Sequence, residues 1–320
     1  MTTKASAVAH PIQGLVKYHG LKDEVLRLPY HDSISVCTAP LRTHTTIQFG
    51  MPHDEAVVDG RALSGREMKR VNDVVDLLRA EAGVTSGFRM VSRNDFPSNV
   101  GLGASASGFA ALALAAARSL ELEMDLVELS RFARRGAGSA SRAVTGGFSR
   151  WYAGEDLTSV SRPLPYPADM DLAMVVAVVP AYKLTDEAHR DVTTSPFFRS
   201  RLEDVPQALA GMERAVQEGD AEDVGRLAEA DTLKLHAVTM TGAQGLIMWR
   251  PDTLRVVLEV RSMRREGIPC YFSIDTGATV YVNTVGRSAT KVRERIAALG
   301  LQTMLCTVGR ESRIVDDHLF

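Results

Sequence analysis

Apolar and polar positions follow two different periods along the first half of the chain. Residues 33–49 are rich in β-branched side chains that alternate in places, which predicts paired strands interrupted near Pro40. Residues 64–82 and 126–135 carry apolar positions at helical spacing, and a second β-rich run ends at 90–92. This order of strands and helices indicates a mixed α/β fold.

The second half begins with a nearly continuous apolar run. Residues 171–180 (DLAMVVAVVP) are closed by proline, and this nearly continuous apolar run predicts a buried strand. Helices are then predicted over 200–219, 221–236, 253–266 and 288–299, and strands over 269–273, 278–283 and 302–308. We therefore expect an α/β (α+β) protein of two domains, over residues 1–182 and 183–320.

The most informative stretch is 96–120, FPSNVGLGASASGFAALALAAARSL, where a Gly/Ser-rich loop runs directly into an Ala-rich helix. Glycines let the backbone approach a ligand, and the first N–H groups of the helix point at it with the positive end of the helix dipole behind them. Such a junction suits the polyphosphate of a nucleotide. The pattern also fits a plain turn capping a buried helix, and it is neither a P-loop nor a dinucleotide fingerprint. The candidate phosphate-binding residues are Asn99, Gly101, Gly103, Ser105, Ser107 and Gly108.

Composition limits the kinds of partner. The formal net charge is −2 and charges of both signs are spread along 320 residues, so no general field gathers nucleic acid or an anionic membrane. The three cysteines form no C-x-x-C pair, and no basic segment with an apolar signal core begins the chain, which favours a reducing cytoplasm. No apolar run reaches the ~18 residues of a membrane span. Any anion site must therefore be local.

A cluster near the N-terminus carries chemistry-bearing side chains. Lys17, Tyr18, His19 and Lys22 fall in one Gly-punctuated stretch before the first predicted strand pair. Tyr18 and Lys22 are candidate substrate-binding residues. The alternative is an ordinary surface loop whose lysines are solvated.

Two further segments combine flexible turns with polar groups. In residues 134–151, Ser139 and Arg142 follow glycines, and an arginine there can hold a carboxylate or phosphate through two hydrogen bonds. In SIDTGATVY, Asp275 lies between a β-type run and a Thr-Gly turn, a position where catalytic side chains are often displayed. A helix-terminal surface arginine and a plain turn are the alternatives.

Four of these segments together resemble a known family. QGLVKYHG, FPSNVGLGASASGFAAL, ARRGAGSASRAVTGGFSRW and SIDTGATVY occur in the order and spacing of the GHMP kinase superfamily, and within it of the mevalonate-pathway decarboxylases, over essentially the whole chain. The resemblance implies an active site in the cleft between two domains, ATP and Mg²⁺ as cofactors, and commonly a homodimer. It implies phosphorylation of a tertiary 3-hydroxyl by ATP, followed by loss of phosphate and carbon dioxide to give an alkene.

The resemblance also implies roles for individual residues. Asp275 matches the catalytic aspartate, which accepts or orients the 3-hydroxyl proton, and Lys17 matches the lysine that steadies it. Arg142 matches the arginine of the S-A-x-R motif, which grips the substrate's C1 carboxylate. Ser105 matches a loop serine near the γ-phosphate and magnesium, and Ser139 a serine near the substrate phosphate.

One departure from the family pattern bears on the substrate. Enzymes that act on the 5-diphosphate typically read K-Y-W-G-K at the first motif, whereas residues 17–21 read K-Y-H-G-L, so Leu21 stands in place of a cation. A serine often found in the A-R-x-G-x-G-S motif is Ala137 here. The missing cation and the missing hydroxyl both favour a substrate with a smaller phosphate group. The K-Y-H-G form also resembles archaeal-type phosphomevalonate decarboxylases. We therefore predict mevalonate 5-phosphate as substrate and isopentenyl phosphate as product.

Three alternatives stay open. The 5-diphosphate is one, because Lys22 or the basic cluster Arg66, Lys69 and Arg70 can restore the missing charge. A mevalonate-type 3-kinase without decarboxylation is the second, although such kinases tend to lack the Asp/Lys/Arg set. A non-catalytic nucleotide-binding protein is the third.

Overall fold

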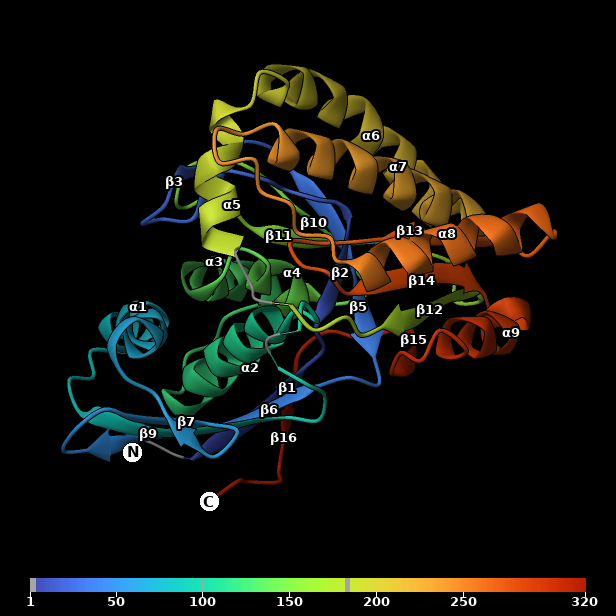
Figure 1. The fold of residues 1–320 in the computed structure, drawn as a ribbon. Coiled ribbons are helices and arrows are strands. Elements are labelled where there is room, and N and C mark those ends of the chain that lie inside the picture. Colours follow the sequence, from blue (N-terminus) through green and yellow to red (C-terminus); the bar gives the residue numbers. More distant parts are fainter. Residues whose placement is uncertain (1–3, 99, 182–184) are drawn as a thin grey trace.

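Two large β-sheets organise the described part of the chain, residues 4–98, 100–181 and 185–320 of this computed structural model (Figure 1). The first sheet has six strands in the order β16-β1-β6-β9-β7-β8, antiparallel except for the parallel β7–β9 pair. Its strands are β1 (Ala5–Ala9), β6 (Thr43–Met51), β7 (Glu55–Val58), β8 (Arg61–Ala62), β9 (Gly87–Asn94) and β16 (Arg313–Val315).

The second sheet has eight strands along the path β11-β10-β5-β15-β12-β14-β13, with β2 paired to β5. Its strands are β2 (Ile12–Val16), β5 (Ser33–Ala39), β10 (Phe148–Trp151), β11 (Ser161–Leu164), β12 (Leu172–Ala177), β13 (Cys270–Ser273), β14 (Val280–Val285) and β15 (Thr303–Val308). Because β15 pairs with β5, this sheet joins strands from both ends of the chain. A small hairpin is formed by β3 (Leu21–Asp23) and β4 (Leu28–Pro29).

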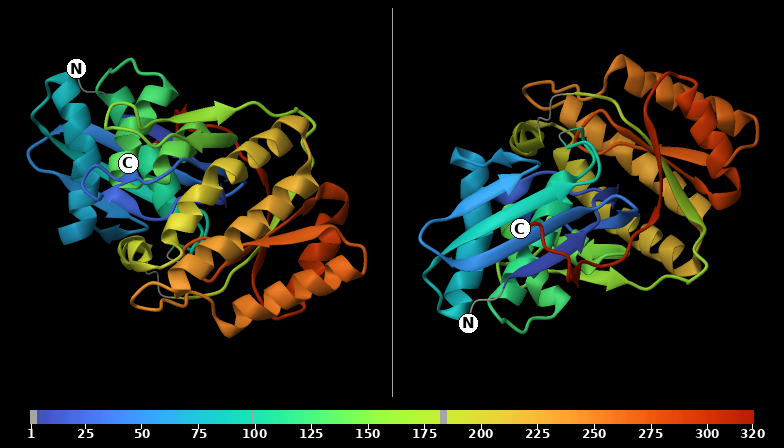
Figure 2. Two further views of the ribbon diagram at one scale, coloured as in Figure 1. Left: turned by 90° about the horizontal axis from the view of Figure 1, so that it is seen from above. Right: turned by 90° about the horizontal axis from the view of Figure 1, so that it is seen from below.

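Helices from the first half pack on one another and contact strands of both sheets. They are α1 (Gly65–Ala82), α2 (Ala104–Ser119), α3 (Leu126–Gly136) and α4 (Ala140–Thr145). The buried side of α2 is almost entirely alanine, including Ala106, Ala110 and Ala113, and these small side chains let the helix lie close to β1 and β6. The view from below shows the outer face of the six-stranded sheet (Figure 2, right).

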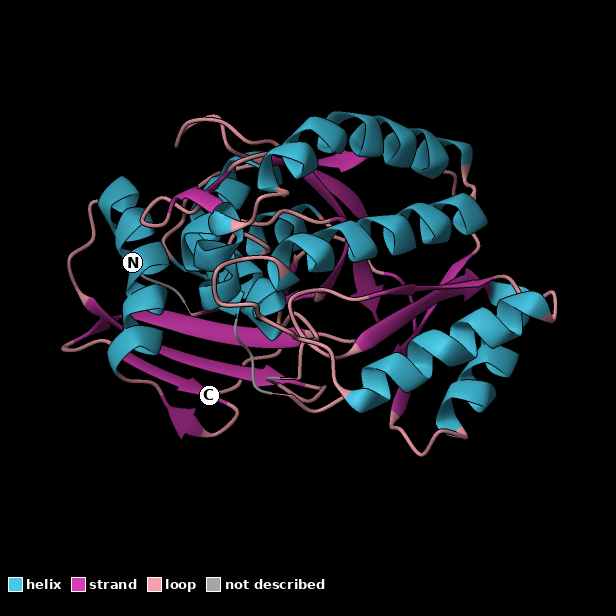
Figure 3. Cartoon of the chain, turned by 45° about the horizontal axis from the view of Figure 1, so that its top comes forward, coloured by secondary structure: helices cyan, strands magenta, loops and turns pink. Residues whose placement is uncertain are grey.

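Of the later helices, all but the first pack on the eight-stranded sheet. These later helices are α5 (Thr185–Asp191), α6 (Phe198–Glu218), α7 (Ala221–Met240), α8 (Pro251–Arg265) and α9 (Gly286–Ala297). The helical hairpin α6–α7 lies on top of the molecule, and α8 and α9 lie near the other side of the sheet (Figures 2 and 3). Along β12, Met174 and Val176 pack with α6 and α7, while Val175 and Ala177 pack with α8 and α9. Burial on both faces explains the continuous apolar run of this strand.

The mixed α/β architecture predicted from the sequence is confirmed. The expected break near Pro40 separates β5 from β6, and the expected helices correspond to α1, α2, α3 and α6 to α9 within a few residues. The predicted boundary between residues 182 and 183 falls outside the described residues, so its exact place stays a prediction. Across the described ranges, none of the helices combines the length and apolarity needed to cross a bilayer.

Candidate active site

The loop before α2 has a backbone that favours glycine. Gly101 and Gly103 have φ angles of 84° and 74°, in the left-handed region. A Cβ on Gly103 would lie 3.2 Å from the carbonyl oxygen of Ile12, closer than most real contacts. Gly103 is also the N-cap of α2, and no described side chain caps this helix end. The N–H of Ala106 donates to the carbonyl of Gly103 at 2.7 Å, while this helix end lacks a side-chain cap from the described residues, a geometry compatible with an anion. Anion binding at this loop stays a prediction.

Three cavities follow one another past this loop. The first, about 370 Å³, lies against α2 and strands β6, β7 and β9. Arg70 and Ser105 line both it and the second cavity, which has a volume of about 480 Å³. Tyr18 and Ser139 line both the second cavity and the third, of about 100 Å³. The shared lining residues place the three cavities next to one another.

The third cavity brings together the three predicted catalytic residues. Lys17 follows β2, Arg142 lies on α4 and Asp275 follows β13, yet all three line this cavity. Gly101 and Gly103 of the α2 loop line it as well. A phosphate bound at the loop would therefore lie beside the three charged groups.

Asp275 presents an unpaired carboxylate oxygen. Its Oδ2 accepts a hydrogen bond from the backbone N–H of Gly14 at 3.2 Å, whereas its buried Oδ1 has no hydrogen-bond partner among the described residues. Gly14 is needed here, because a Cβ would lie 2.9 Å from Oδ1. Burial raises the pKa of Asp275, and Lys17, the Gly14 N–H and Arg142 oppose that rise. A buried oxygen without a partner is suited to accept a substrate hydroxyl proton.

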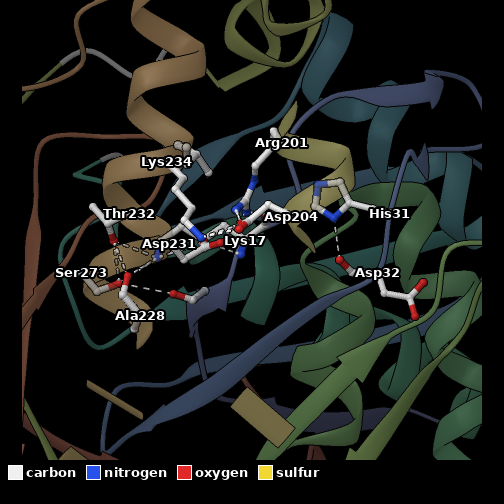
Figure 4. Close-up of polar contacts among 12 residues, drawn as sticks. Lys17, His31, Asp32, Arg201, Asp204, Ala228, Asp231, Thr232, Lys234 and Ser273 are labelled. Atoms are coloured by element: carbon white, nitrogen blue, oxygen red, sulfur yellow. Dashed lines mark hydrogen bonds and ion pairs between the residues drawn. The ribbon is translucent and has the colours of Figure 1, made fainter. Parts of the chain in front are cut away.

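Lys17 is held by a buried polar network (Figure 4). Its Nζ donates hydrogen bonds to the hydroxyls of Thr232 and Ser273, both at 3.0 Å, and lies 3.9 Å from Asp231 Oδ2. Burial lowers the pKa of Lys17, while the charges of Asp231 and then Asp275 act to raise it. The ammonium group is thus fixed in place and electrostatically coupled to Asp275.

The backbone of Lys17 is fixed by the same network. Asp231 Oδ2 accepts a hydrogen bond from the Lys17 N–H at 2.9 Å, and Arg201 donates to the Lys17 carbonyl at 3.0 Å. Arg201 and Asp231 form a buried ion pair at 2.5 Å. Sequence reasoning missed both residues. The one available signal was a set of polar side chains on the buried side of α7, but the pattern did not reveal their partners.

Arg142 lies in an aromatic cage. Its guanidinium carbon is 5.3 Å from the ring centre of Tyr18 and 5.5 Å from that of Trp151, and one nitrogen donates to the hydroxyl of Ser33. Its Nε has no partner in the described part of the chain. Burial lowers the pKa of Arg142 to about 10, so the group stays protonated at neutral pH. A rigid, charged, incompletely paired guanidinium is suited to hold a carboxylate.

The predicted substrate-binding residues differ in position. The Tyr18 ring stacks on His189 at 4.9 Å, and Ser139 is the N-cap of α4 and lines two cavities. Lys22 instead extends to Glu155 at 3.4 Å, on the surface. The arginines that line the second cavity are Arg27, Arg66 and Arg70. Direct substrate contact by Tyr18, Ser139 and Lys22 stays a prediction.

The predicted nucleotide residues also differ in accessibility. Ser105 and Gly108 line the first cavity, whereas Ser107 is fully buried and its hydroxyl lies 2.6 Å from that of Thr43. Asn99 lies outside the described residues. ATP contacts at all of these positions stay predictions.

Comparisons with known proteins identify the family. Residues 9–162 match the model of the diphosphomevalonate decarboxylase-like N-terminal domain, and residues 181–296 match the mevalonate 5-diphosphate decarboxylase C-terminal domain. The phosphomevalonate decarboxylase of Haloferax volcanii is 46% identical over 98% of both chains.

Solved structures show the same similarity. Mevalonate diphosphate decarboxylase from Staphylococcus aureus superposes with a TM-score of 0.94 and 30% identity, covering 99% of each chain. A complex of MDDEF with MVAPP, AMPPCP and magnesium has a TM-score of 0.91 and 30% identity, covering 98% of this chain and 99% of that one. These matches confirm the resemblance drawn from the four motifs and the two-domain fold. The chain belongs to the mevalonate-pathway decarboxylases of the GHMP kinase superfamily.

Proposed function

We propose that this protein decarboxylates mevalonate 5-phosphate with ATP, giving isopentenyl phosphate, ADP, phosphate and carbon dioxide. The observation that carries the proposal is the convergence of Asp275, Lys17 and Arg142 in one buried cavity beside the α2 loop. The 46% identical Haloferax relative is a phosphomevalonate decarboxylase, which favours the monophosphate. The Staphylococcus structure is a mevalonate diphosphate decarboxylase, so the 5-diphosphate is the alternative.

The α2 loop is the proposed site of the ATP polyphosphate. Its helix N-terminus, which no described side chain caps, favours anions, and the adjoining first cavity has room for the nucleoside, with Ser105 and Gly108 on its wall. The Ser105 hydroxyl is an oxygen donor of the kind that Mg²⁺ prefers, and bound magnesium supplies charge neutralisation at the phosphates. A structural neighbour binds AMPPCP and magnesium, which supports both assignments.

Asp275 and Lys17 serve the first step. The free Oδ1 of Asp275 takes the proton of the 3-hydroxyl while the hydroxyl oxygen forms its bond to the γ-phosphorus and ADP leaves. Burial raises the pKa of Asp275, and the charge of Lys17 opposes that rise, which favours the ionised carboxylate that this step needs. The Gly14 N–H, bonded to Oδ2, orients the carboxylate.

Arg142 serves the second step. It holds the C1 carboxylate while the bond from C3 to the phosphate oxygen breaks and positive charge develops at C3. The electron pair of the C1–C2 bond then forms the C2–C3 double bond, and carbon dioxide leaves. The aromatic cage fixes the plane of the guanidinium, so the carboxylate is held in one orientation.

A side-by-side assay tests this function. Purified protein is given ATP, Mg²⁺ and either mevalonate, its 5-phosphate or its 5-diphosphate, and carbon dioxide and ADP are measured. The 5-phosphate is expected to react fastest. Much faster release from the 5-diphosphate would establish the alternative substrate, a stable phosphorylated product without gas would indicate a 3-kinase, and ATP binding without turnover would indicate a non-catalytic protein.

The family resemblance also supports a cytoplasmic homodimer. It further supports two domains, for which we propose residues 1–182 and 183–320; the two family models match residues 9–162 and 181–296. Light scattering on the purified protein would test the dimer, with an expected mass of twice the 34.7 kDa chain. A mass of one chain would refute it.

A further inference from the structure

An ion pair between distant segments borders the second cavity. Arg66 on α1 donates to the carboxylate of Asp186 on α5. Both residues also line a smaller adjoining cavity of about 40 Å³, and Leu21 lies in its wall. Leu21, which stands in place of a cation, and the carboxylate of Asp186 therefore line the same small cavity.

The charges around the second cavity are balanced. Its described lining residues include three arginines and three carboxylates: Arg27, Arg66, Arg70, Glu67, Asp186 and Glu187. A cavity made for a highly charged anion would be expected to carry a surplus of cations. Apart from the imidazole of His189, the described lining residues supply no such surplus here.

The three arginines that line the second cavity already form hydrogen bonds or an ion pair with other groups of the protein. Arg70 donates to the carbonyl of Gly136 at 3.0 and 2.6 Å, and Arg27 Nε donates to the carbonyl of Arg135 at 3.2 Å. Arg66, which is 69% exposed, is paired with Asp186. Burial would raise the pKa of Asp186, but Arg70, Arg27 and Arg66 outweigh it and lower that pKa, so the carboxylate is ionised at neutral pH.

We propose that Asp186 restricts this pocket to a single phosphate, because its carboxylate occupies the place where a second phosphate would meet Arg66. This inference rests on the proposed function. A phosphate monoester carries −1.5 to −2 charges, and a further phosphate adds negative charge that must be neutralised. In this pocket the additional phosphate meets the Asp186 carboxylate, and like charges at an interface disfavour the wrong ligand.

Asp186→Asn tests the proposal. The amide keeps the shape, removes the charge and frees Arg66, so kcat/KM for the 5-diphosphate is expected to rise relative to that for the 5-phosphate. Because a charge-assisted contact is gained, the ratio is expected to change about tenfold or more. Both esters are assayed on one preparation of each protein. A ratio within about twofold of the wild-type ratio overturns the proposal.

Asp73→Asn is the matched control. Asp73 lies on the same helix as Arg66 and pairs with Lys69 at 2.7 Å, and it lines none of these cavities. The same charge is removed, so an equal shift of the ratio in this variant would also overturn the proposal by showing that net charge alone is responsible.

Equilibrium binding separates the proposal from the proposed function. If the wild-type protein decarboxylates neither ester, the proposed function fails, whereas calorimetry with the two esters still tests Asp186. A relative gain in diphosphate affinity in Asp186→Asn supports the role of Asp186 as a barrier, and unchanged relative affinities overturn it. If the Asp186→Asn variant binds both esters but decarboxylates neither, the same calorimetry still tests the role of Asp186.

Discussion

Ion pairs of arginine or lysine with aspartate lie beside both the second and the third cavity, but they are buried at the third and exposed to solvent at the second. Around the third cavity, Lys17, Asp231 and Arg201 are buried and tied to one another through side chains and backbone. Around the second, Arg66 and Asp186 pair at the surface, with 69% and 30% of their side chains exposed. Breaking a buried pair leaves a charge uncompensated, whereas an exposed pair exchanges partners at little cost. We therefore expect changes in the third cavity to abolish chemistry and changes in the second to redirect substrate choice.

The largest expected effect is at Asp275. Asp275→Asn keeps the shape but removes the group that takes the hydroxyl proton, so kcat should fall ~10²- to 10⁴-fold. ATP binding, measured by calorimetry, should stay close to that of the wild type. Near-normal kcat in a pure, folded variant would remove Asp275 from the mechanism.

Asp231→Asn tests whether the buried network is also structural. Removal of one partner from a buried ion pair typically costs about 3–5 kcal/mol, because the other partner stays buried without compensation. Urea unfolding should report a loss of this size. Asp252→Asn, which removes the partner of Arg255 at the surface, should cost under about 1 kcal/mol. Similar losses in the two variants would contradict the distinction between buried and exposed pairs.

Arg142→Lys keeps the charge and removes the planar grip on the carboxylate. A charge-assisted hydrogen bond contributes about 1.5–3 kcal/mol, so kcat/KM should fall about tenfold or more. Arg118→Lys, at an exposed position in the last turn of α2, should leave kcat/KM unchanged. Unchanged kinetics in Arg142→Lys would require a different carboxylate-binding group.

The pH dependence of kcat/KM follows from Asp275. Burial raises its pKa, so the base loses its proton at a higher pH than an ordinary aspartate, and activity should rise with pH through that raised value. Linkage gives the opposite sign for stability. The contribution of Asp275 is fully present below its unfolded pKa and is lost as pH rises through the folded pKa. Urea unfolding across pH should show this loss in the wild type and not in Asp275→Asn.

The smallest expected effect is at Leu21. Leu21→Lys places a cation in the wall of the small cavity and should shift relative kcat/KM towards the 5-diphosphate. Asp186 lies in the same wall and would pair with the new ammonium, so the shift should stay below about tenfold. Leu21→Met adds no charge and should leave the ratio unchanged. A shift towards the 5-phosphate in Leu21→Lys would contradict this interpretation.

Local patterns predicted the parts of the molecule that depend on local sequence. The glycines of the α2 loop and the alanines of α2 occupy consecutive positions, so composition was enough to predict the junction. The apolar run of residues 171–180 was enough to predict the buried strand β12. The convergence of Lys17, Arg142 and Asp275 was predicted only because four motifs appeared in a family's order.

Pairings between distant segments were not predicted. Arg201 and Asp231 lie on two different helices, and Arg66 and Asp186 are 120 residues apart, so no spacing rule connects either pair. The strands β10 and β11 have four residues each, too few for a period to be recognised. These features depend on tertiary packing, which a single sequence does not display.

The position of β16 has a consequence for how the protein is made. β1 lies between β6 and β16, and the Ser6 hydroxyl contacts Thr46 at 2.6 Å and His318, 312 residues later, at 2.7 Å. During synthesis, the outer edge of β1 therefore stays unpaired until the chain has been made through Val315. An unpaired strand edge is a template for association with other chains. Nascent chains are thus exposed to intermolecular pairing at this edge of β1 until β16 has emerged.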